Sequence, residues 1–140
     1  MSFVLDASAT LAWHFEDEAT EKVRAIARRA FENGITVPQH WLLEVLSALV
    51  RGERRRRASA DRTNEFIIRL GDLDAEVDPF DEGRAVSVLL PLARERRLSL
   101  YDAAYLELSH RLRLPLATLD NSLARAAEEM GVELLLGEPT

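Results

Sequence analysis

Four carboxylates in this chain stand at positions where a folded α/β protein can use them for chemistry. Asp6 directly follows the apolar segment FVL, and Asp120 directly follows PLATL. Asp102 stands at the start of a predicted helix in SLYDAAYLEL, and Glu44 lies early in the predicted helix QHWLLEVLSALVR. Ligands of open parallel sheets bind in the crevice beyond the carboxyl ends of the strands. We therefore expect these four acids to converge at one edge of a parallel sheet.

Carboxylates packed together repel one another unless one of them is protonated or a cation lies between them. An all-oxygen ligand set selects Mg²⁺ or Mn²⁺ over zinc or copper. Carboxylate-held Mg²⁺ usually completes its coordination shell with water and substrate phosphate, and a pair of such ions promotes phosphodiester hydrolysis. Ser8, Thr118 and Asn121 stand beside the two strand-terminal aspartates. Each of these three would either orient a ligating carboxylate or cap a helix.

Helix capping offers a simpler explanation for the aspartates taken singly. Asp and Ser are favoured N-cap residues, so the aspartates after the two strands would each cap the helix that follows. Ser99 and Asp102 fit the capping-box pattern loosely, with Ser99 as the cap. Helical spacing makes Glu44 an ordinary glutamate on a polar face, one turn from His40, and does not single it out. Only the four acids together indicate a metal site.

The elements that would position these acids alternate between short apolar segments and longer helical patterns. The predicted strands are FVL (3–5), ITV (35–37), PLATL (115–119) and VELLL (132–136). Helical spacing predicts helices over 17–33, 39–51, 60–71, 82–97, 100–112 and 121–130. Gly34 and Gly131 would close the first and last of these helices, and Pro38 would stand at the start of the second. We predict an α/β sandwich around a small parallel sheet, with no convincing strand between 39 and 112.

The composition bounds the class of protein. The chain has 140 residues, of which 47% are hydrophobic and 30% charged, as is typical of one soluble globular domain. It has no cysteine, which excludes disulfides, thiolate nucleophiles and Cys-based metal sites. No apolar run reaches the roughly 20 residues that cross a bilayer, and we expect neither a membrane partner nor a signal peptide. The expected location is the cytoplasm.

The net charge of the chain disfavours nucleic-acid binding, whereas one basic segment favours it. The formal net charge is −6, which disfavours indiscriminate binding to a polyanion. The run RGERRRR is nonetheless strongly basic, and its cationic residues are Arg51, Arg54, Arg55, Arg56 and Arg57. Such a run is commonly a solvated helix end, where cations complement the helix dipole. The functional interpretation is contact with RNA phosphates or with an acidic segment of a partner protein.

Other phosphoryl-transfer chemistries find little support in the sequence. A receiver-type domain needs a lysine beside its aspartates, and the only lysine, Lys22, lies in a polar stretch typical of the surface. A dehalogenase-type phosphatase needs a DxD pair, whereas this chain has DAS, and no Gly-rich phosphate loop is present. His14, His40 and His110 share no spacing typical of metal ligands, and we expect them to be structural.

Four motifs occur in order over nearly the whole chain: FVLDASATLAWHFEDE, VPxxWLLEV, LSLYDAAYLEL and LPLATLDNSLARAA. Together they resemble the PIN domain and, within that family, the VapC-type toxins of type II toxin–antitoxin pairs. The resemblance implies a three-layer α/β/α sandwich with a parallel sheet of four or five strands, formed as a single domain over residues 1–140.

The resemblance also implies an activity. It implies a Mg²⁺-dependent endoribonuclease, with Mn²⁺ possible, whose catalytic and metal-binding acids form a quartet: Asp6, Glu44, Asp102 and Asp120. Ser8 and Thr118 match the family's polar residues near the first and last aspartates, whereas Ser47 stands where relatives often carry Asn. The implied partners are RNA, a second copy of the chain and a small VapB-like antitoxin. The alternative is a catalytically inert PIN-like protein-binding module, but such a module has no use for four repelling acids.

Overall fold

The computed structural model describes residues 2–136 of the chain. In chain order its elements are β1 (Phe3–Leu5), α1 (Ala7–Leu11), the 3-10 turn η1 (Glu16–Glu18), α2 (Glu21–Asn33), β2 (Ile35–Pro38), α3 (Trp41–Arg54), α4 (Ala60–Leu70), β3 (Ala75–Asp78), α5 (Glu82–Arg84), the π-helical turn η2 (Ala85–Leu89), α6 (Leu90–Arg96), α7 (Leu100–Leu112), β4 (Leu116–Ala117) and α8 (Asn121–Glu129).

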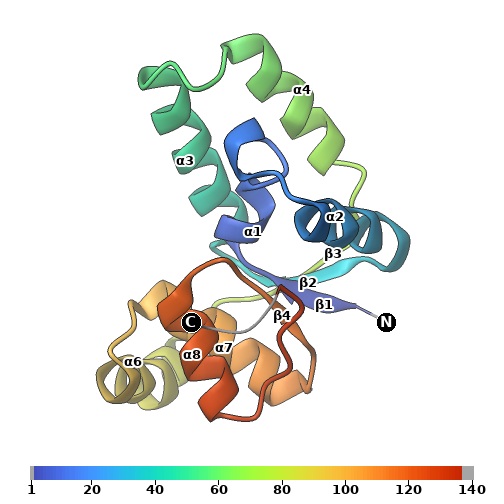
Figure 1. The fold of residues 1–140 in the computed structure, drawn as a ribbon. Coiled ribbons are helices and arrows are strands. Elements are labelled where there is room, and N and C mark those ends of the chain that lie inside the picture. Colours follow the sequence, from blue (N-terminus) through green and yellow to red (C-terminus); the bar gives the residue numbers. More distant parts are fainter. Residues whose placement is uncertain (1, 137–140) are drawn as a thin grey trace.

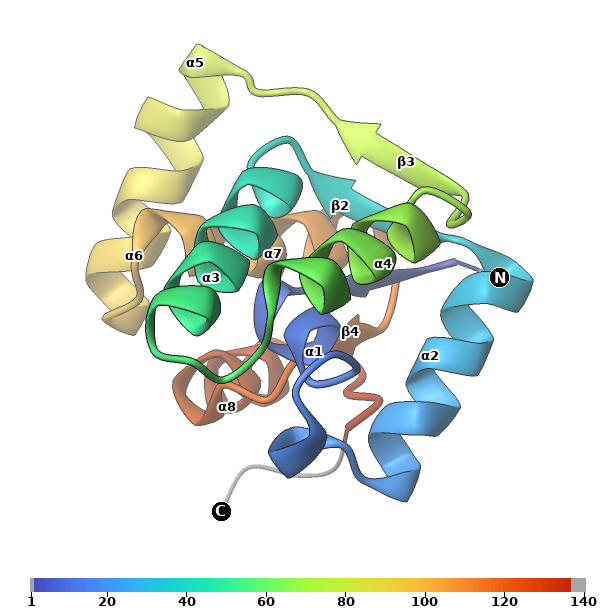
Figure 2. The same cartoon turned by 90° about the horizontal axis from the view of Figure 1, so that it is seen from above.

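The sheet has four strands in the order β3-β2-β1-β4, and every neighbouring pair is parallel. Figure 1 shows this sheet edge-on between two helical layers, with α1 to α4 on one side and α6 to α8 on the other. Figure 2 looks down onto the first of these layers, where α3, α4 and α2 surround α1. The predicted fold class, a three-layer α/β/α sandwich around a small parallel sheet, is confirmed.

The two central strands carry the core because helices cover both faces of the sheet. Phe3, Val4 and Leu5 of β1 are fully buried, and all four residues of β2 are buried as well. Strands covered on both faces are continuously apolar rather than alternating, which is why these short runs were recognisable in the sequence. Within residues 2–136, no helix has the length and apolar character needed to cross a bilayer.

The sheet contains one strand that the sequence patterns do not predict. β3 lies between 39 and 112, where no convincing strand is expected, and this expectation is wrong. The four residues of β3 are half-buried or exposed, because β3 forms the edge of the sheet next to β2. With little apolar surface to bury, β3 has no apolar signature.

The predicted strands near the C-terminus are shorter than expected. PLATL contributes only Leu116 and Ala117 to β4. VELLL forms a single parallel bridge, between Leu134 and Leu116, and no regular strand. The strand expected at 132–136 is therefore a loop that pairs with β4 at this single bridge.

The helices match the predicted stretches with shifted ends. α2 begins only at Glu21, because Thr20 caps it by accepting a hydrogen bond from the Val23 N–H (3.2 Å). Gly34 closes α2 as expected, with a φ of +80° that favours glycine. Pro38 does not start a helix, contrary to expectation, but ends β2, and α3 begins at Trp41.

Candidate active site

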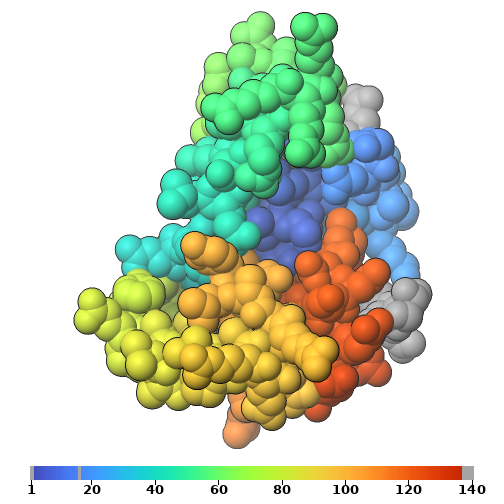
Figure 3. All heavy atoms as spheres, turned by 90° about the vertical axis from the view of Figure 1, so that its left-hand side faces the viewer, coloured from blue at the N-terminus to red at the C-terminus, as the bar shows by residue number. Residues whose placement is uncertain are grey.

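The topology brings the four acids together at the carboxyl ends of the strands. β1 and β4 are neighbours, so the acids that follow them emerge side by side, while α3 and α7 supply the other two. The quartet lines one cavity of about 230 Å³, together with Ala7, Ser8, Ser99, Tyr101 and Tyr105. Figure 3 shows the dark-blue N-terminal segment at the bottom of a hollow between α3 above and α7 and α8 below. The expected convergence of the acids is what the structure shows.

Asp6 is the most constrained acid of the quartet. Its side chain is 3% exposed, and its Oδ1 accepts hydrogen bonds from the Ala9 N–H (2.9 Å) and the Ser8 hydroxyl (2.8 Å). Its Oδ2 accepts a hydrogen bond from the Thr118 hydroxyl. Asp6 therefore caps α1, as the capping explanation predicts, and its fixed carboxylate also lines the cavity.

Ser8 and Thr118 connect Asp6 to the end of β4. The Ser8 hydroxyl accepts a hydrogen bond from the Leu119 N–H (2.9 Å), and the Thr118 hydroxyl accepts one from the Asp120 N–H (3.0 Å). Both hydroxyls also donate a hydrogen bond to Asp6. Each hydroxyl therefore links a backbone N–H group just after β4 to the Asp6 carboxylate. Asn121, the third polar residue singled out in the sequence, starts α8 and does not line the cavity.

Asp120 and Asp102 each keep carboxylate oxygens available. Asp120 caps α8 through Oδ1, which accepts from the Leu123 N–H (2.9 Å). α7 is capped by Ser99, whose hydroxyl accepts from the Asp102 N–H (3.0 Å), so the Asp102 side chain is not needed as a cap. The predicted capping roles are therefore correct for Ser99 and Asp120, and they leave the remaining oxygens to the cavity.

Glu44 reaches the cavity from α3 and is held there by an aromatic group. The Tyr105 hydroxyl donates a hydrogen bond of 2.8 Å to its Oε1. His40 Nε2 lies 3.2 Å from the same oxygen, as expected for residues one turn apart, although without the geometry of a hydrogen bond. The His40 ring packs against the rings of Tyr101 and Tyr105, with centroids 5.2 and 5.0 Å away.

The cavity is strongly acidic because four carboxylates line it and, within residues 2–136, no lysine or arginine side chain does. Burial raises the pKa of Asp6 to about 6, and the hydrogen bonds from Thr118, Ala9 and Ser8 offset this only in part. The pKa of Asp102 also rises to about 6, first through burial and then through the negative charges of Asp120 and Glu44. Burial and the neighbouring Glu44 carboxylate raise the pKa of the Tyr105 hydroxyl, which therefore stays a donor at neutral pH.

The donor set of this cavity fits a hard divalent cation. The side-chain oxygens that it offers to a cation include four carboxylates, the ligand type that Mg²⁺ and Mn²⁺ prefer. Within residues 2–136, no three acidic or histidine side chains are close enough to hold one ion by themselves. This arrangement agrees with Mg²⁺, which is usually bound through one or two carboxylates and keeps several waters.

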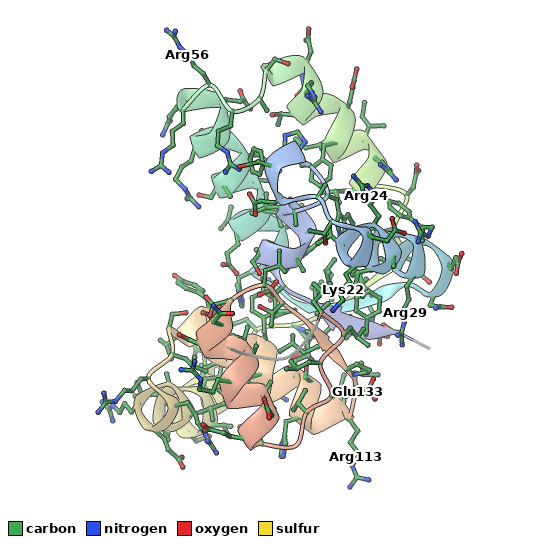
Figure 4. The ribbon with its side chains drawn as sticks, in the orientation of Figure 1. Lys22, Arg24, Arg29, Arg56, Arg113 and Glu133 are labelled. Carbon is green, nitrogen blue, oxygen red and sulfur yellow. The ribbon has the colours of Figure 1, made fainter. Side chains whose placement is uncertain are left out.

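The arginine run 51–57 lies at the far end of α3 from the cavity, about 15 Å from Glu44 along ten residues of helix. Figure 4 shows Arg56 at the tip of the α3–α4 turn, pointing away from the rest of the molecule. Arg51 and Arg54 occupy the last turn of α3, where they also complement the helix dipole. Arg51, Arg54, Arg55 and Arg56 are exposed and available to a partner.

Arg57 differs from the other arginines of this run because it is engaged within the protein. Its Nη2 contacts Asp17 Oδ1 (2.8 Å) and Glu18 Oε2 (2.9 Å). Its guanidinium lies 4.0 Å from the ring centroid of Phe15. The sequence gives no hint of this pairing, because the acids are about 40 residues away. We therefore exclude Arg57 from the partner contacts that we propose below.

Two aromatic residues of the site were not singled out from the sequence. Tyr105 and Tyr101 both line the cavity, and His40, expected to be purely structural, contacts both rings and Glu44. The signal for Tyr105 is its spacing: it stands three residues after Asp102 on α7, so both side chains lie on one face of that helix.

A three-layer α/β/α sandwich with an acidic cavity at the carboxyl ends of a parallel sheet defines a class of proteins that bind ligands at this edge. The PIN domain family model matches residues 3–129, and the chain belongs to this family. PIN domains are generally metal-dependent nucleases that act on RNA and typically bind divalent metal ions. The identification as a PIN domain is therefore confirmed.

The search of solved structures finds the same fold. The crystal structure of PAE2754 from Pyrobaculum aerophilum superimposes with a TM-score of 0.68, over 96% of this chain and 90% of that chain, at 19% sequence identity. At this identity the similarity concerns the fold. No curated protein matches the chain.

Proposed function

We propose that this protein is a Mg²⁺-dependent endoribonuclease, with Mn²⁺ as the alternative ion, and that the quartet is its catalytic and metal-binding centre. One observation carries the proposal: four acids from four separate segments line one cavity, to which the described part of the chain contributes no lysine or arginine. Such a concentration of like charge costs stability unless a cation compensates it. Membership of the PIN family supports a nuclease function for the cation site.

The residues of the cavity have different roles in this proposal. A bound Mg²⁺ ion would neutralise charge at the phosphate and promote attack by water. Among the described residues, no hydrogen-bond donor reaches one carboxylate oxygen of each of Asp102, Asp120 and Glu44, and one or two of these carboxylates, together with water, would hold the ion. Asp6 is fixed by Ser8 and Thr118, which keep its carboxylate aimed at the cavity.

We further propose that the protein is the toxin of a VapC-type toxin–antitoxin pair, acts in the cytoplasm and is controlled by a VapB-like antitoxin. The four sequence motifs support this assignment. We also propose a homodimer, for which the exposed apolar side chains of α3 and the segment from β3 to η2 give support: Leu43 is 73% exposed, Phe80 66% and Val86 69%. Apolar surface of this kind marks protein–protein interfaces.

We expect purified protein, free of antitoxin, to cleave a pool of cellular RNAs in Mg²⁺ or Mn²⁺ and to lose this activity in EDTA. The reason is that water attack on a phosphodiester needs charge neutralisation and an activated nucleophile, and in this acidic cavity a bound cation supplies both. Gel electrophoresis of the RNA pool measures the cleavage. Cleavage that persists in EDTA contradicts the metal mechanism, and absence of cleavage in every metal favours the inert PIN-like binding module instead.

A second prediction concerns the exposed part of the arginine run. Replacing Arg54, Arg55 and Arg56 with Gln should weaken binding to RNA or to the antitoxin. It should also reduce the slope of log affinity against log salt by up to about three for RNA, since each lost phosphate contact lowers the slope by about one. Binding measured across a salt titration, in the absence of divalent metal, tests this.

The matched control for the arginine prediction removes the same charge elsewhere. Arg94, Arg97 and Arg113 are exposed residues on the opposite side of the sheet, and their replacement with Gln changes the net charge by the same amount. If both triple variants change RNA and antitoxin binding equally, the arginine run acts only through net charge and is a solvated helix end.

A further inference from the structure

The contact between Tyr105 and Glu44 joins two of the helices that form the cavity. Tyr105 lies on α7, is 1% exposed and donates its hydroxyl hydrogen to Glu44 Oε1 at 2.8 Å. Glu44 lies on α3, 61 residues away, and its side chain remains 35% exposed. A long, partly solvated glutamate has many rotamers, so a fixed partner is needed to keep its carboxylate over the cavity.

The two protein contacts of Glu44 fall on the same carboxylate oxygen. Tyr105 donates to Oε1, and His40 Nε2 lies 3.2 Å from that atom as well. Among the described residues, none makes a hydrogen bond or an ion pair with Oε2. The carboxylate is therefore held by one oxygen, and the other oxygen is available to a ligand.

We infer that Tyr105 is a positioning residue, which holds Glu44 through Oε1 so that Oε2 is presented to the divalent cation. This inference rests on the proposed metal centre and adds a group that neither the family match nor the sequence motifs assign to it. The tyrosine itself does not contact the ion. It acts through Glu44. The His40 ring packs against the Tyr105 ring and limits its movement, which keeps the Tyr105 hydroxyl within hydrogen-bonding distance of the Glu44 carboxylate.

The expected size of the effect follows from other metal sites. Removing a group that hydrogen-bonds to a metal ligand typically weakens metal affinity by about 10- to 100-fold. Phe at position 105 keeps the buried ring and removes only the hydroxyl, so the core packing around α7 stays filled. The affinity for the ion should therefore fall without a loss of fold.

The test is calorimetric titration of Mn²⁺ into the metal-free protein, without RNA. We expect Tyr105→Phe to bind Mn²⁺ at least about tenfold more weakly than the wild type. Ser109→Ala is the matched control, because it removes a buried hydroxyl from the same helix outside the cavity, and its affinity should stay unchanged. Melting curves without metal verify that both variants are folded.

A double-mutant cycle separates positioning from a general structural role. In the Glu44→Ala background, Tyr105→Phe should add no further loss of Mn²⁺ affinity, because the tyrosine acts only through Glu44. Additive losses in the double variant overturn the inference, and so does wild-type affinity in Tyr105→Phe. Mn²⁺ binding that is weakened by Tyr105→Phe, in a protein that cleaves no RNA, supports the inference and contradicts the proposed nuclease function. A wild type that binds no Mn²⁺ overturns both.

Discussion

Asp102→Ala is expected to reduce RNA cleavage by about 10²- to 10³-fold or more, to near background, while the protein remains folded. Loss of a metal ligand removes several kcal/mol of charge stabilisation from the transition state, and each 1.4 kcal/mol or so is a factor of ten in rate. The fold should survive because Ser99, and not the Asp102 carboxylate, caps α7. Removing one of the repelling charges should even favour the metal-free fold.

The matched control for Asp102→Ala is Glu107→Ala. Glu107 is an acid on the same helix that lies outside the cavity, where it pairs with Arg111 (2.8 Å). Its replacement removes the same charge and should leave cleavage unchanged. Cleavage by Asp102→Ala at the wild-type rate would contradict the proposed centre, and so would toxicity on expression that substitution of the quartet leaves intact.

The other members of the quartet need variants that respect their structural roles. Asp6 and Asp120 cap α1 and α8, so an alanine at either position also costs about 0.5–2 kcal/mol of stability. Asn keeps an oxygen for the cap and removes the charge, which makes Asn the cleaner substitution. Glu44 caps no helix, and we expect Glu44→Ala to abolish cleavage as Asp102→Ala does. Because this variant leaves the buried Tyr105 hydroxyl without its acceptor, metal-free melting curves must verify that it is folded.

The strand-terminal aspartates could be located from the sequence, but the contacts of Glu44 could not. Asp6 and Asp120 each follow a buried strand, and the pattern of apolar runs fixes where such residues emerge in a parallel sheet. Glu44 looked like any polar-face glutamate, because the group that holds it is Tyr105, 61 residues away on another helix. Only the family resemblance pointed to it.

The same limit explains the other differences between expectation and structure. β3 was missed because it is an edge strand with little buried surface, and its pairing with β2 is set by tertiary structure. Arg57 was grouped with its neighbours because its partners, Asp17 and Glu18, lie far away in sequence. Local sequence patterns show which residues are buried and whether a segment is helical or extended. They do not show which distant segments contact each other, and this becomes known only from the three-dimensional structure.

The metal-free protein is expected to lose stability as the pH rises from about 4 to about 7, and Mg²⁺ is expected to restore it. Asp6 has a pKa of about 6 in the folded protein against 3.8 as its ordinary value, so the folded state binds this proton more tightly than the unfolded state does. The stability from this carboxyl is therefore fully present below about pH 4 and is lost as the pH rises through about 6. The shift is about 2 pKa units, and at roughly 1.4 kcal/mol per unit the loss is on the order of 3 kcal/mol.

Asp6→Asn tests the origin of this pH dependence because Asn removes the charge and can keep Oδ1 as the acceptor for the Ala9 N–H. The metal-free variant should melt several degrees above the wild type near pH 7, and the difference should vanish near pH 4, where the wild-type carboxyl is protonated. Mg²⁺ should raise the melting temperature of the wild type near pH 7 and raise that of the variant much less, because the ion stabilises only a native state that binds it.

Thermal melts in EDTA and in Mg²⁺ across this pH range measure both effects, with Asp61→Asn on α4 as the control for a lost surface charge. If metal-free Asp6→Asn instead melts well below the wild type near pH 7, then the Asp6 carboxylate mainly stabilises the fold as a helix cap and is not held there for a cation.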